Sequence, residues 1–340
     1  MKLVVVTQQV DPASPVLGAT VDKLRALAAR VDELVVLADS AVDGSLPGNC
    51  RVRLFRSRHR AGRGLRFESA LARELVRRPR PAAVLAHMCP IYAVLAAPLA
   101  RPAGVDVLLW FTHWRRSRLL AAATRASTTV LSVDERTFPL RTGKLVAIGH
   151  GIDVTGFTCV TRQERKPLTL LALGRTSPAK GLETIVRAVG QVERMLLRIV
   201  GPATTEEERL HKIALERLVI DLRLLDCVDI GGPVPRAAVP DLYAHVDALV
   251  NDMRPGATDK VVYEAAATCL PVIASNPAFD TLLPPELRFE HGDVDGLAAV
   301  LASLRRLDRN ALGRELRERV VREHSVDVWA DRVVELAARP

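Results

Sequence analysis

Short apolar runs recur along the whole chain, and stretches with helical periodicity separate many of them. Runs of this kind are typical of strands that are buried on both faces of a sheet. In the first half they are Leu3–Val6, Leu34–Leu37, Val52–Phe55, Ala83–Ala86, Val107–Phe111, Thr129–Ser132 and Leu145–Ala147. In the second half they are Leu168–Leu173, Met195–Val200, Val228–Ile230, Ala248–Asn251, Val272–Ala274 and the shorter Arg288–Phe289. We predict a strand at each of them.

Helical periodicity lies between several of these strands, for example over Thr20–Arg30 and Phe67–Arg77. The alternation of strands and helices predicts an α/β protein built from parallel sheets with helices on both faces. A chain of 340 residues is long enough for two such domains. The polar segment Phe157–Lys166 between the two halves is the predicted linker, and the stretch from Arg314 to the end is predicted to be helical.

The overall composition is that of a globular protein. Hydrophobic residues make up 49% of the chain and the mean hydropathy is positive. The segment Met1–Gln9 turns polar after a short apolar run, so it is interpreted as a first strand and not as a signal peptide. His87, Pro90 and Pro98 interrupt the uncharged stretch Ala82–Ala100, which favours a strand, a turn and a buried helix over a membrane span.

The cysteines are scattered, and they form no Cys-x-x-Cys pair. They are odd in number, namely Cys50, Cys89, Cys159, Cys227 and Cys269. This pattern predicts reduced thiols in a cytoplasmic protein and argues against a zinc site or a disulfide framework.

Arginine supplies most of the net charge of +9. Eleven arginines lie between Arg51 and Arg80. Three interpretations are open: a solvated face, a surface for an anionic acceptor, and a peripheral contact with an anionic membrane at its inner face. Nucleic acid is not expected, because aromatic residues are only 4% of the chain and just Phe55 and Phe67 accompany the arginines.

The loop that follows the predicted strand Leu168–Leu173 carries two cations, Arg175 and Lys180, and then opens into a helix. The carboxyl end of a strand followed by the amino terminus of a helix is where α/β proteins bind ligands. Backbone N–H groups there favour anions, and a forked arginine beside a flexible lysine suits a diphosphate. We predict a phosphate site at this loop, with solvated surface cations as the alternative.

A second segment has the same order of elements. The strand Ala248–Asn251 leads into a loop with Gly256 and Thr258, and Glu264 then lies near the start of a helix. A carboxylate in that position can accept two hydrogen bonds from the vicinal diol of a ribose, while the loop amides face phosphate. The alternative is a solvated glutamate that is favoured by the helix dipole.

Together these segments resemble the carboxyl-terminal domain of retaining GT-B glycosyltransferases, specifically glycosyltransferase family 4. Gly174, Arg175, Lys180 and Gly181 match one motif of that family. Glu264 and the strand start Cys269-Leu270-Pro271-Val272 match a second, and Ile148–Asp153 resembles the segment that precedes the second domain. One departure is that Gly256 stands where the family has the first glutamate of Glu-x7-Glu.

The resemblance implies a GT-B architecture of two Rossmann-like domains that face a cleft. Residues 1–157 would form an acceptor-binding domain, residues 158–322 a nucleotide-sugar domain, and residues 323–340 a helix that crosses back onto the first domain. Gly18, in the loop after the first strand, is the position that matches a glycine near the donor diphosphate. Contacts to the base are expected near Pro233 and Val234. That first loop lacks Gly-x-Gly-x-x-Gly, which argues against a dinucleotide-dependent oxidoreductase.

Two histidines follow apolar strands of the first half. His113 is expected to contact the donor sugar, because many members of the family have a histidine at this point. His87 has two interpretations, an acceptor or proton-relay residue and a core histidine. The sequence Asp293-Val294-Asp295 looks like a metal site, but an N-cap at a helix start explains it more simply, so we expect no metal.

The resemblance implies transfer of a sugar from a nucleotide-sugar, UDP- or GDP-linked, to a hydroxyl-bearing small molecule, glycan or lipid-linked acceptor, with retention and without a cofactor. Arg175 and Lys180 would neutralise the leaving diphosphate. Thr258 and Asp259 would form hydrogen bonds with sugar hydroxyls, which Gly256 cannot do because it has no side chain. Two alternatives are an epimerase or phosphorylase on the same architecture, and a nucleotide-sugar-binding protein without turnover.

Overall fold

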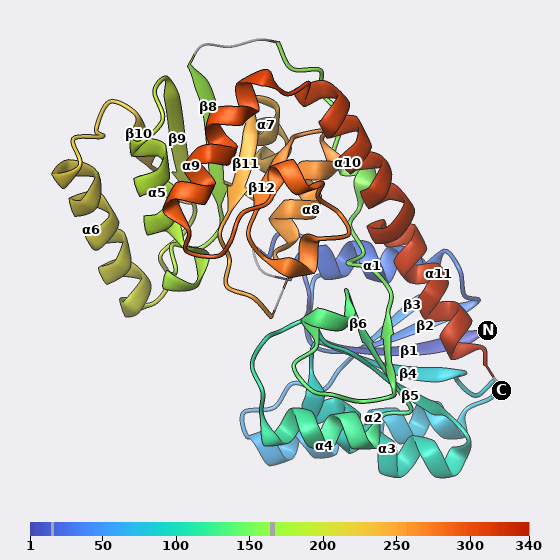
Figure 1. Ribbon diagram of the computed structural model, residues 1–340. Coiled ribbons are helices and arrows are strands. Elements are labelled where there is room, and N and C mark those ends of the chain that lie inside the picture. The colour runs from blue at the N-terminus through green and yellow to red at the C-terminus, as the bar shows by residue number, and fades with distance from the viewer. Residues whose placement is uncertain (15–16, 164–166, 257, 340) are drawn as a thin grey trace. The chain divides into compact units, whose positions relative to one another are not determined.

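The computed structural model describes residues 1–14, 17–163, 167–256 and 258–339 (Figure 1). The chain packs as two compact units. One unit comprises Met1–Asp153 together with Glu323–Pro340, and the other comprises Val154–Arg322. The carboxyl-terminal segment therefore belongs to the first unit, although the whole second unit separates the two parts of the first unit in the sequence.

The first unit is built on a parallel sheet in the order β3-β2-β1-β4-β5-β6-β7. Its strands are β1 (Lys2–Val10), β2 (Glu33–Ala41), β3 (Cys50–Leu54), β4 (Ala83–His87), β5 (Asp106–Trp110), β6 (Thr129–Ser132) and β7 (Leu145–Ala147). The strand order reverses between β1 and β4, which is the point where open α/β sheets bind ligands at their carboxyl edge. Gly18 lies in the loop after β1, and His87 is the last residue of β4.

Side chains alternate across this sheet, so each face has its own core. Val4, Val6 and Leu37 point to the face that packs against α2 (Arg60–Val76), α3 (Pro90–Ala100) and α4 (Arg118–Ala126). Figure 1 shows these three helices on one side of the sheet, and α1 (Ala19–Ala28) and α11 (Val326–Ala337) contact each other. Burial on both faces explains why the inner strands, such as β4 and β5, are continuous apolar runs.

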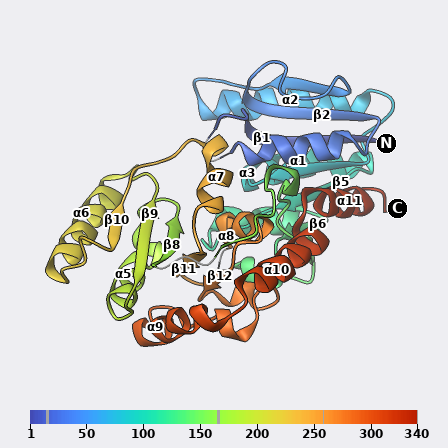
Figure 2. The same ribbon diagram turned by 90° about the horizontal axis from the view of Figure 1, so that it is seen from above.

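The second unit has the sheet order β10-β9-β8-β11-β12, again parallel. The strands are β8 (Leu168–Leu173), β9 (Met195–Val200), β10 (Val228–Ile230), β11 (Ala248–Asn251) and β12 (Val272–Ala274). The helices are α5 (Leu182–Gly190), α6 (Glu206–Asp221), α7 (Val239–Ala244), α8 (Lys260–Ala267), α9 (Val294–Ser303) and α10 (Arg309–His324). Figure 2 shows α6 beside the β10 end of the sheet.

The strand predictions are confirmed at every run except the shortest one. Arg288 makes only an isolated bridge to Ala274, so Arg288–Phe289 is not a strand. The helix predicted over Phe67–Arg77 begins earlier, at Arg60. Its first two turns carry arginines and two glycines, which hide the periodicity that marked the later part.

The prediction of reduced thiols is wrong for one pair of cysteines. Cys159 and Cys269 form a disulfide with Cα atoms 4.9 Å apart and a sequence separation of 110. Cys50, Cys89 and Cys227 are free. The sequence could not reveal this pair, because only the fold brings the end of α8 against the segment that precedes β8.

The described part of the predicted linker is held against the second unit. Arg162 is buried, and its guanidinium donates hydrogen bonds to the carbonyl oxygens of Val160, Tyr243, Val246 and Cys269. Its backbone N–H donates to the Asn310 side chain at 2.8 Å. Residues 164–166 of the predicted linker lie outside the described residues. Arg162 and the disulfide therefore both fasten this segment to the second unit.

We expect Cys159→Ser to lower the free energy of unfolding. A cross-link closing a loop of about 100 residues is worth roughly 4 kcal/mol through the entropy of the unfolded chain. Urea unfolding of the variant and the parent measures this, with Cys227→Ser as the control because that thiol is unpaired. Alkylation of the denatured, unreduced protein should label Cys50, Cys89 and Cys227 only. Labelling of Cys159 as well would show that the bond does not form.

The arginine-rich surface of the first unit has a structural part and an exposed part. Arg51 and Arg53 each lie 2.8 Å from a carboxylate oxygen of Glu74, whose carboxylate is fully buried and also pairs with Lys2 at 2.8 Å. Burial acts to raise the pKa of Glu74, but Lys2 and the two arginines outweigh it and lower that pKa. The exposed arginines are Arg56, Arg58, Arg60, Arg66, Arg73, Arg77, Arg78 and Arg80.

Two large apolar side chains of α2 are exposed among these arginines, Leu65 at 67% and Val76 at 79%. This combination of cations and exposed apolar groups keeps the membrane-surface interpretation open. Within the described residues, no helix is both long enough and apolar enough to cross a membrane.

Candidate active site

The loop from Gly174 to Gly181 joins the carboxyl end of β8 to α5. Gly174 has a φ of 132°, and a Cβ built there would lie 2.7 Å from Lys180 Nζ. Gly181 has a φ of 58° and packs against the carboxylate of Asp252. Ser177 caps the short 3-10 turn Pro178–Lys180 by accepting a hydrogen bond from the Ala179 N–H. Glycine is required at both positions because a side chain would displace the charged groups beside them.

Lys180 is held in place by a side chain that comes from the second loop. Its Nζ forms an ion pair with Asp259 Oδ2, and both side chains are at least 85% buried. Asn251 Nδ2 donates a hydrogen bond of 2.9 Å to the same oxygen of Asp259. The cation is therefore fixed between the end of β11, the start of α8 and Gly174. We predicted Asp259 as a sugar-binding residue, and in the structure its carboxylate is occupied by Lys180 and Asn251.

Arg175 is positioned by a different carboxylate. Its Nη1 lies 2.8 Å from Glu208 Oε1, while 58% of the arginine side chain is exposed. Glu208 also accepts hydrogen bonds from Thr204 and Thr205, and with Thr205 it forms the capping box of α6. Burial acts to raise the pKa of Glu208, but these hydrogen bonds and Arg175 hold it below its usual value. Glu208 therefore holds Arg175 in position, while much of the guanidinium side chain stays exposed to solvent.

Glu264 is almost fully buried on α8, with 5% of its side chain exposed. Arg236 Nη1 and Lys260 Nζ lie 3.6 and 3.7 Å from Glu264 Oε1, and the buried Tyr243 hydroxyl donates to Oε2 at 3.5 Å. Burial raises the pKa of Glu264 above its usual value, and Lys260 and Arg236 only partly oppose this effect. The carboxylate thus sits where its charge is costly, which is common at functional sites.

We expect Glu264→Gln to be more stable than the parent at neutral pH. Because burial raises the folded-state pKa of Glu264, the unfolding free energy of the parent falls as the pH rises through the window between the unfolded and folded pKa values. Glutamine keeps the shape and carries no charge. Urea unfolding from about pH 4 to pH 7 should show a gap that opens with pH. A less stable variant at pH 7 would mean that attraction to Lys260 and Arg236 exceeds the burial cost.

The loop between β11 and α8 also holds the other donor-site residues predicted from sequence. Gly256 has a φ of 102°, so the backbone itself requires glycine at the position of the absent glutamate. The hydroxyl of Thr258 is buried and has no hydrogen-bond partner among the described residues. Pro233 and Val234 are exposed after β10, next to the 3-10 turn that carries Arg236. The structure thus links the predicted base-contact segment to Glu264 through Arg236.

In the first unit, His113 is exposed in the loop after β5. Its Nδ1 accepts a hydrogen bond of 3.0 Å from the Arg115 N–H, and its ring stacks on Trp114 with centroids 5.4 Å apart. Gly18 is the N-cap of α1 with a φ of −54°, which any residue can adopt. Backbone conformation therefore gives no reason for glycine at position 18.

His87 is buried at the end of β4. Its ring lies edge-on to Trp329 of α11 with centroids 6.4 Å apart, and both ring nitrogens lack hydrogen-bond partners among the described residues. Lys23 of α1 is nearby, stacked over Trp110 and Trp329. Burial, with Lys23 as a second cause, lowers the pKa of His87 well below its usual value. The imidazole is therefore neutral, and its role as an acceptor residue stays a prediction.

Asp293 caps α9, as predicted, because its side chain accepts the hydrogen bond of the Gly296 N–H. Asp295 lies in the first turn and accepts a hydrogen bond from Gln191. The described residues contain no group of side chains arranged to hold a metal ion.

Comparison with solved structures identifies the architecture. HepE from Anabaena, solved in complex with UDP, is 16% identical with a TM-score of 0.79 and 99% coverage of both chains. Sucrose-phosphate synthase from Thermosynechococcus elongatus is 18% identical with a TM-score of 0.75, covering 99% of this chain and 98% of that one. A glycosyltransferase from Rickettsia africae is 14% identical with a TM-score of 0.78. It covers 99% of this chain and 97% of its own. This chain has the GT-B fold.

The family comparison agrees for the second unit of the GT-B fold. Residues 167–306 match the family model described as "Glycosyl transferases group 1". No curated protein matches the sequence. The matched stretch contains both predicted phosphate-side cations and Glu264, whereas His113 and His87 lie outside it.

We did not predict from the sequence the side chains that position the predicted site residues. Asn251 contacts Asp259 from eight residues away, and Glu208 and Arg236 contact Arg175 and Glu264 from other segments of the chain. Only Lys260 carried a signal in the sequence, since it lies one helical turn before Glu264.

Proposed function

We propose that this protein is a retaining glycosyltransferase of family 4 type, which moves a sugar from a nucleotide-sugar to a hydroxyl-bearing acceptor. The observation that carries the proposal is the pairing of Lys180 with Asp259 at the start of α8. This ion pair places an ammonium group at the carboxyl edge of the sheet, beside the N–H groups of a helix terminus. Such a position favours a phosphate group.

The proposed chemistry needs charge stabilisation more than it needs a protein nucleophile. Breaking the bond between sugar and diphosphate builds negative charge on the leaving group. Lys180, Arg175 and the amides at the start of α8 would stabilise that charge, and the fixed partners of both cations keep the reorganisation small. The departing phosphate would then act as the base for attack on the same face of the sugar.

We propose that Glu264 accepts the ribose hydroxyls and that the Pro233–Val234 segment contacts the base. The lysine and arginine beside Glu264 favour its carboxylate form, in opposition to the effect of burial. We propose that His113 and Thr258 contact the donor sugar, because Gly256 cannot supply a carboxylate. Gly18 beside the diphosphate, His87 on the acceptor side, and the assignment of the acceptor to residues 1–157 remain further parts of the proposal.

A thermal-shift panel of UDP, GDP, ADP, CMP and dTDP tests the donor site. We expect one nucleotide to raise the melting temperature, because a ligand at about 100 times its Kd adds roughly 2.7 kcal/mol to the folded state. The shift should be lost in Lys180→Ala and kept in Lys212→Ala, whose lysine lies on α6 and faces Glu216. A panel without any response would contradict a nucleotide-sugar donor.

A second candidate function is binding of a nucleotide-sugar without turnover. The glycine at position 256, in place of the expected glutamate, is the observation that favours it. It predicts a nucleotide-dependent shift without transfer or hydrolysis across acceptors. Product formation from any acceptor would exclude it.

We also propose that the exposed arginines of the first unit dock on an anionic membrane surface, with Leu65 and Val76 as apolar contacts. Co-sedimentation with vesicles that contain phosphatidylglycerol, compared with neutral phosphatidylcholine vesicles, tests this. Binding to neither would contradict it. A cytoplasmic location stays a prediction, and the disulfide is uncommon for that compartment.

A further inference from the structure

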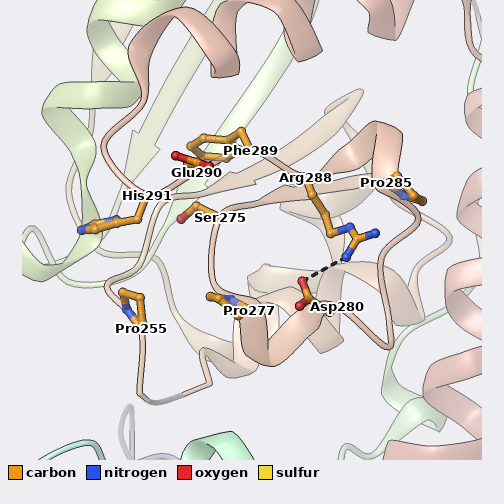
Figure 3. A pocket seen from close by; sticks show the side chains of 9 residues that line it. All are labelled: Pro255, Ser275, Pro277, Asp280, Pro285, Arg288, Phe289, Glu290 and His291. Carbon is orange, nitrogen blue, oxygen red and sulfur yellow. Dashed lines mark ion pairs between the residues drawn. The ribbon is translucent and has the colours of Figure 1, made fainter.

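A pocket of about 470 Å³ opens at the carboxyl ends of β11 and β12, and Figure 3 shows the ion pair of Arg288 and Asp280 on its wall. Lys180 and Asp259 also follow the carboxyl ends of strands of this sheet, so the pocket belongs to the site already described. The outer face of α6 is a different surface, because the proposed function involves only Glu208 of that helix.

The two faces of α6 differ in burial. Its buried residues are Glu208, Leu215 and Val219. Three large apolar side chains are exposed on the opposite face, namely Leu210 at 59%, Ile213 at 60% and Ile220 at 57%. A helix at the surface of a soluble domain usually has a polar outer face. An apolar stripe in that position therefore indicates a contact with another molecule.

The stripe on the outer face has the spacing of a coiled-coil seam. Its members are separated alternately by four and three residues, and they are Glu206, Leu210, Ile213, Arg217 and Ile220. This spacing places side chains on one line along the helix, where they can interlock with a second helix. Glu206 lies one turn before Leu210, and Arg217 lies one turn after Ile213. The central apolar pair is thus flanked by opposite charges.

A stripe with opposite charges at its two ends is complementary to a second copy of itself in the antiparallel direction. When Leu210 packs against the partner's Ile213, two-fold symmetry makes the same contact a second time. This register sets Glu206 opposite the partner's Arg217, again twice. The two helices then have apolar side chains at the centre of their contact and an ion pair at each end.

The charges beside the stripe agree with the same register. In an antiparallel pair, residues on one flank of a helix face residues on the same flank of its partner. Arg209 then lies beside the partner's Glu216, and these side chains are 54% and 49% exposed. Arg209 also pairs with Glu206 of its own helix at 2.6 Å. The contact between two copies would therefore join these charges into one network.

Other arrangements of two α6 helices bring like charges together. In a parallel pair each residue of the stripe meets its own copy, so Glu206 faces the partner's Glu206 and Arg217 faces the partner's Arg217. An antiparallel pair shifted to place Leu210 against the partner's Ile220 sets Glu216 beside the partner's Glu216. An anionic membrane is also disfavoured, because α6 carries more acidic than basic side chains.

We infer that α6 is a self-association surface, through which two copies of this chain pair in the antiparallel direction with Leu210 and Ile213 at the centre. Each copy contributes one helix face, whereas stable dimers bury more than about 1,200 Å² in total. The dimer is therefore expected to be weak and to depend on protein concentration. The inference goes beyond the proposed function and does not rest on it, because the residues of this contact are not those of the nucleotide-sugar site.

Sedimentation velocity of the full chain over a range of concentrations tests the inference. We expect the parent to change from monomer to dimer as its concentration rises. Ile213→Asp should weaken association at least about tenfold, because it places an unpaired charge at the centre of the contact. The matched control is Val42→Asp, at a position after β2 that is 51% exposed, and it should associate like the parent.

Charge reversal tests the register of the two helices. Arg217→Glu and Glu206→Arg should each weaken association, because like charges then meet at both ends of the contact. An equimolar mixture of these two variants should recover the dimer, because a pair with one chain of each kind has opposite charges at both ends. Thermal melts show whether each variant is folded.

The outcomes distinguish this inference from its alternatives and from the proposed function. A parent that stays monomeric at every concentration would overturn it, and so would a dimer that Ile213→Asp leaves intact. Failure of the mixed charge variants to recover the dimer would overturn the antiparallel register. Binding of a monomeric parent to phosphatidylglycerol vesicles, if lost in Ile213→Asp, would assign the face to a membrane instead. The thermal shift with nucleotide should be equal in the parent and Ile213→Asp, so the donor site is tested separately.

Discussion

Lys180→Ala is expected to lower kcat/KM for sugar transfer by about 10²–10³, because a fixed group that stabilises developing negative charge is typically worth this much. In the structure Lys180 is held by Asp259, whose own geometry is set by Asn251. Alanine removes the cation and leaves the Asp259 carboxylate in the same place, where it repels the diphosphate. Steady-state kinetics with the nucleotide-sugar selected by the thermal-shift panel measures the loss.

Variants of Asp259 separate the effect of the Lys180 charge from the effect of the position of Lys180. Lys180→Ala combined with Asp259→Asn removes the repelling carboxylate, so it should recover part of the loss in nucleotide affinity without recovering kcat. Asp259→Asn alone keeps Lys180 and the shape of the site, and should lower kcat more than it raises KM. Near-parental kcat/KM in Lys180→Ala, with Lys212→Ala as the control, would remove Lys180 from the mechanism.

Gly201→Ala is expected to cause the largest loss of stability, about 3–5 kcal/mol, through steric overlap in a packed loop. Gly201 follows β9, and a Cβ placed on it would lie 1.8 Å from the carbonyl oxygen of Gly174. The two loops are also tied by the hydrogen bond from the Thr176 N–H to the Pro202 carbonyl, at 2.9 Å. The methyl group must therefore push apart the ends of β8 and β9.

The control for this substitution is Gly232→Ala, because a Cβ at that position meets nothing within 4 Å. Urea unfolding of the two variants should give a large loss for position 201 and less than about 1 kcal/mol for position 232. The same displacement moves Gly174 and hence Lys180, so nucleotide binding should weaken even where Gly201→Ala is folded. Equal stability of the two variants would show that the loop relaxes freely.

The strands could be predicted because both sheets are parallel and covered on both faces. A buried parallel strand has to be apolar along its whole length, and this makes runs such as Leu168–Leu173 visible without any tertiary information. The start of α2 was not visible, because its exposed first turns are rich in arginine and lack an apolar stripe. The prediction of a strand at Arg288–Phe289 was wrong, because two residues are too few to show whether a continuous ladder forms, and Arg288 makes only an isolated bridge.

The positions of Arg175, Lys180 and Glu264 were also available from the sequence. Each lies at a fixed spacing from the end of a strand or the start of a helix, and local geometry then fixes which edge of the sheet it reaches. Their partners were not available. Glu208 comes from α6 and Asp259 from the start of α8, and no spacing rule connects them to the β8 loop.

The sequence by itself thus determined the order of strands and helices, the α/β class and the edge where charged side chains gather, because these follow from local periodicity. Only the tertiary structure decided that Asp259 holds Lys180, that Glu264 is buried between Arg236 and Lys260, and that Cys159 bonds to Cys269. Apart from the contact between Lys260 and Glu264, which lie one helical turn apart, these are contacts between separate segments of the chain. Their formation depends on how the helices pack on the sheet, and such packing leaves no periodic trace in the sequence.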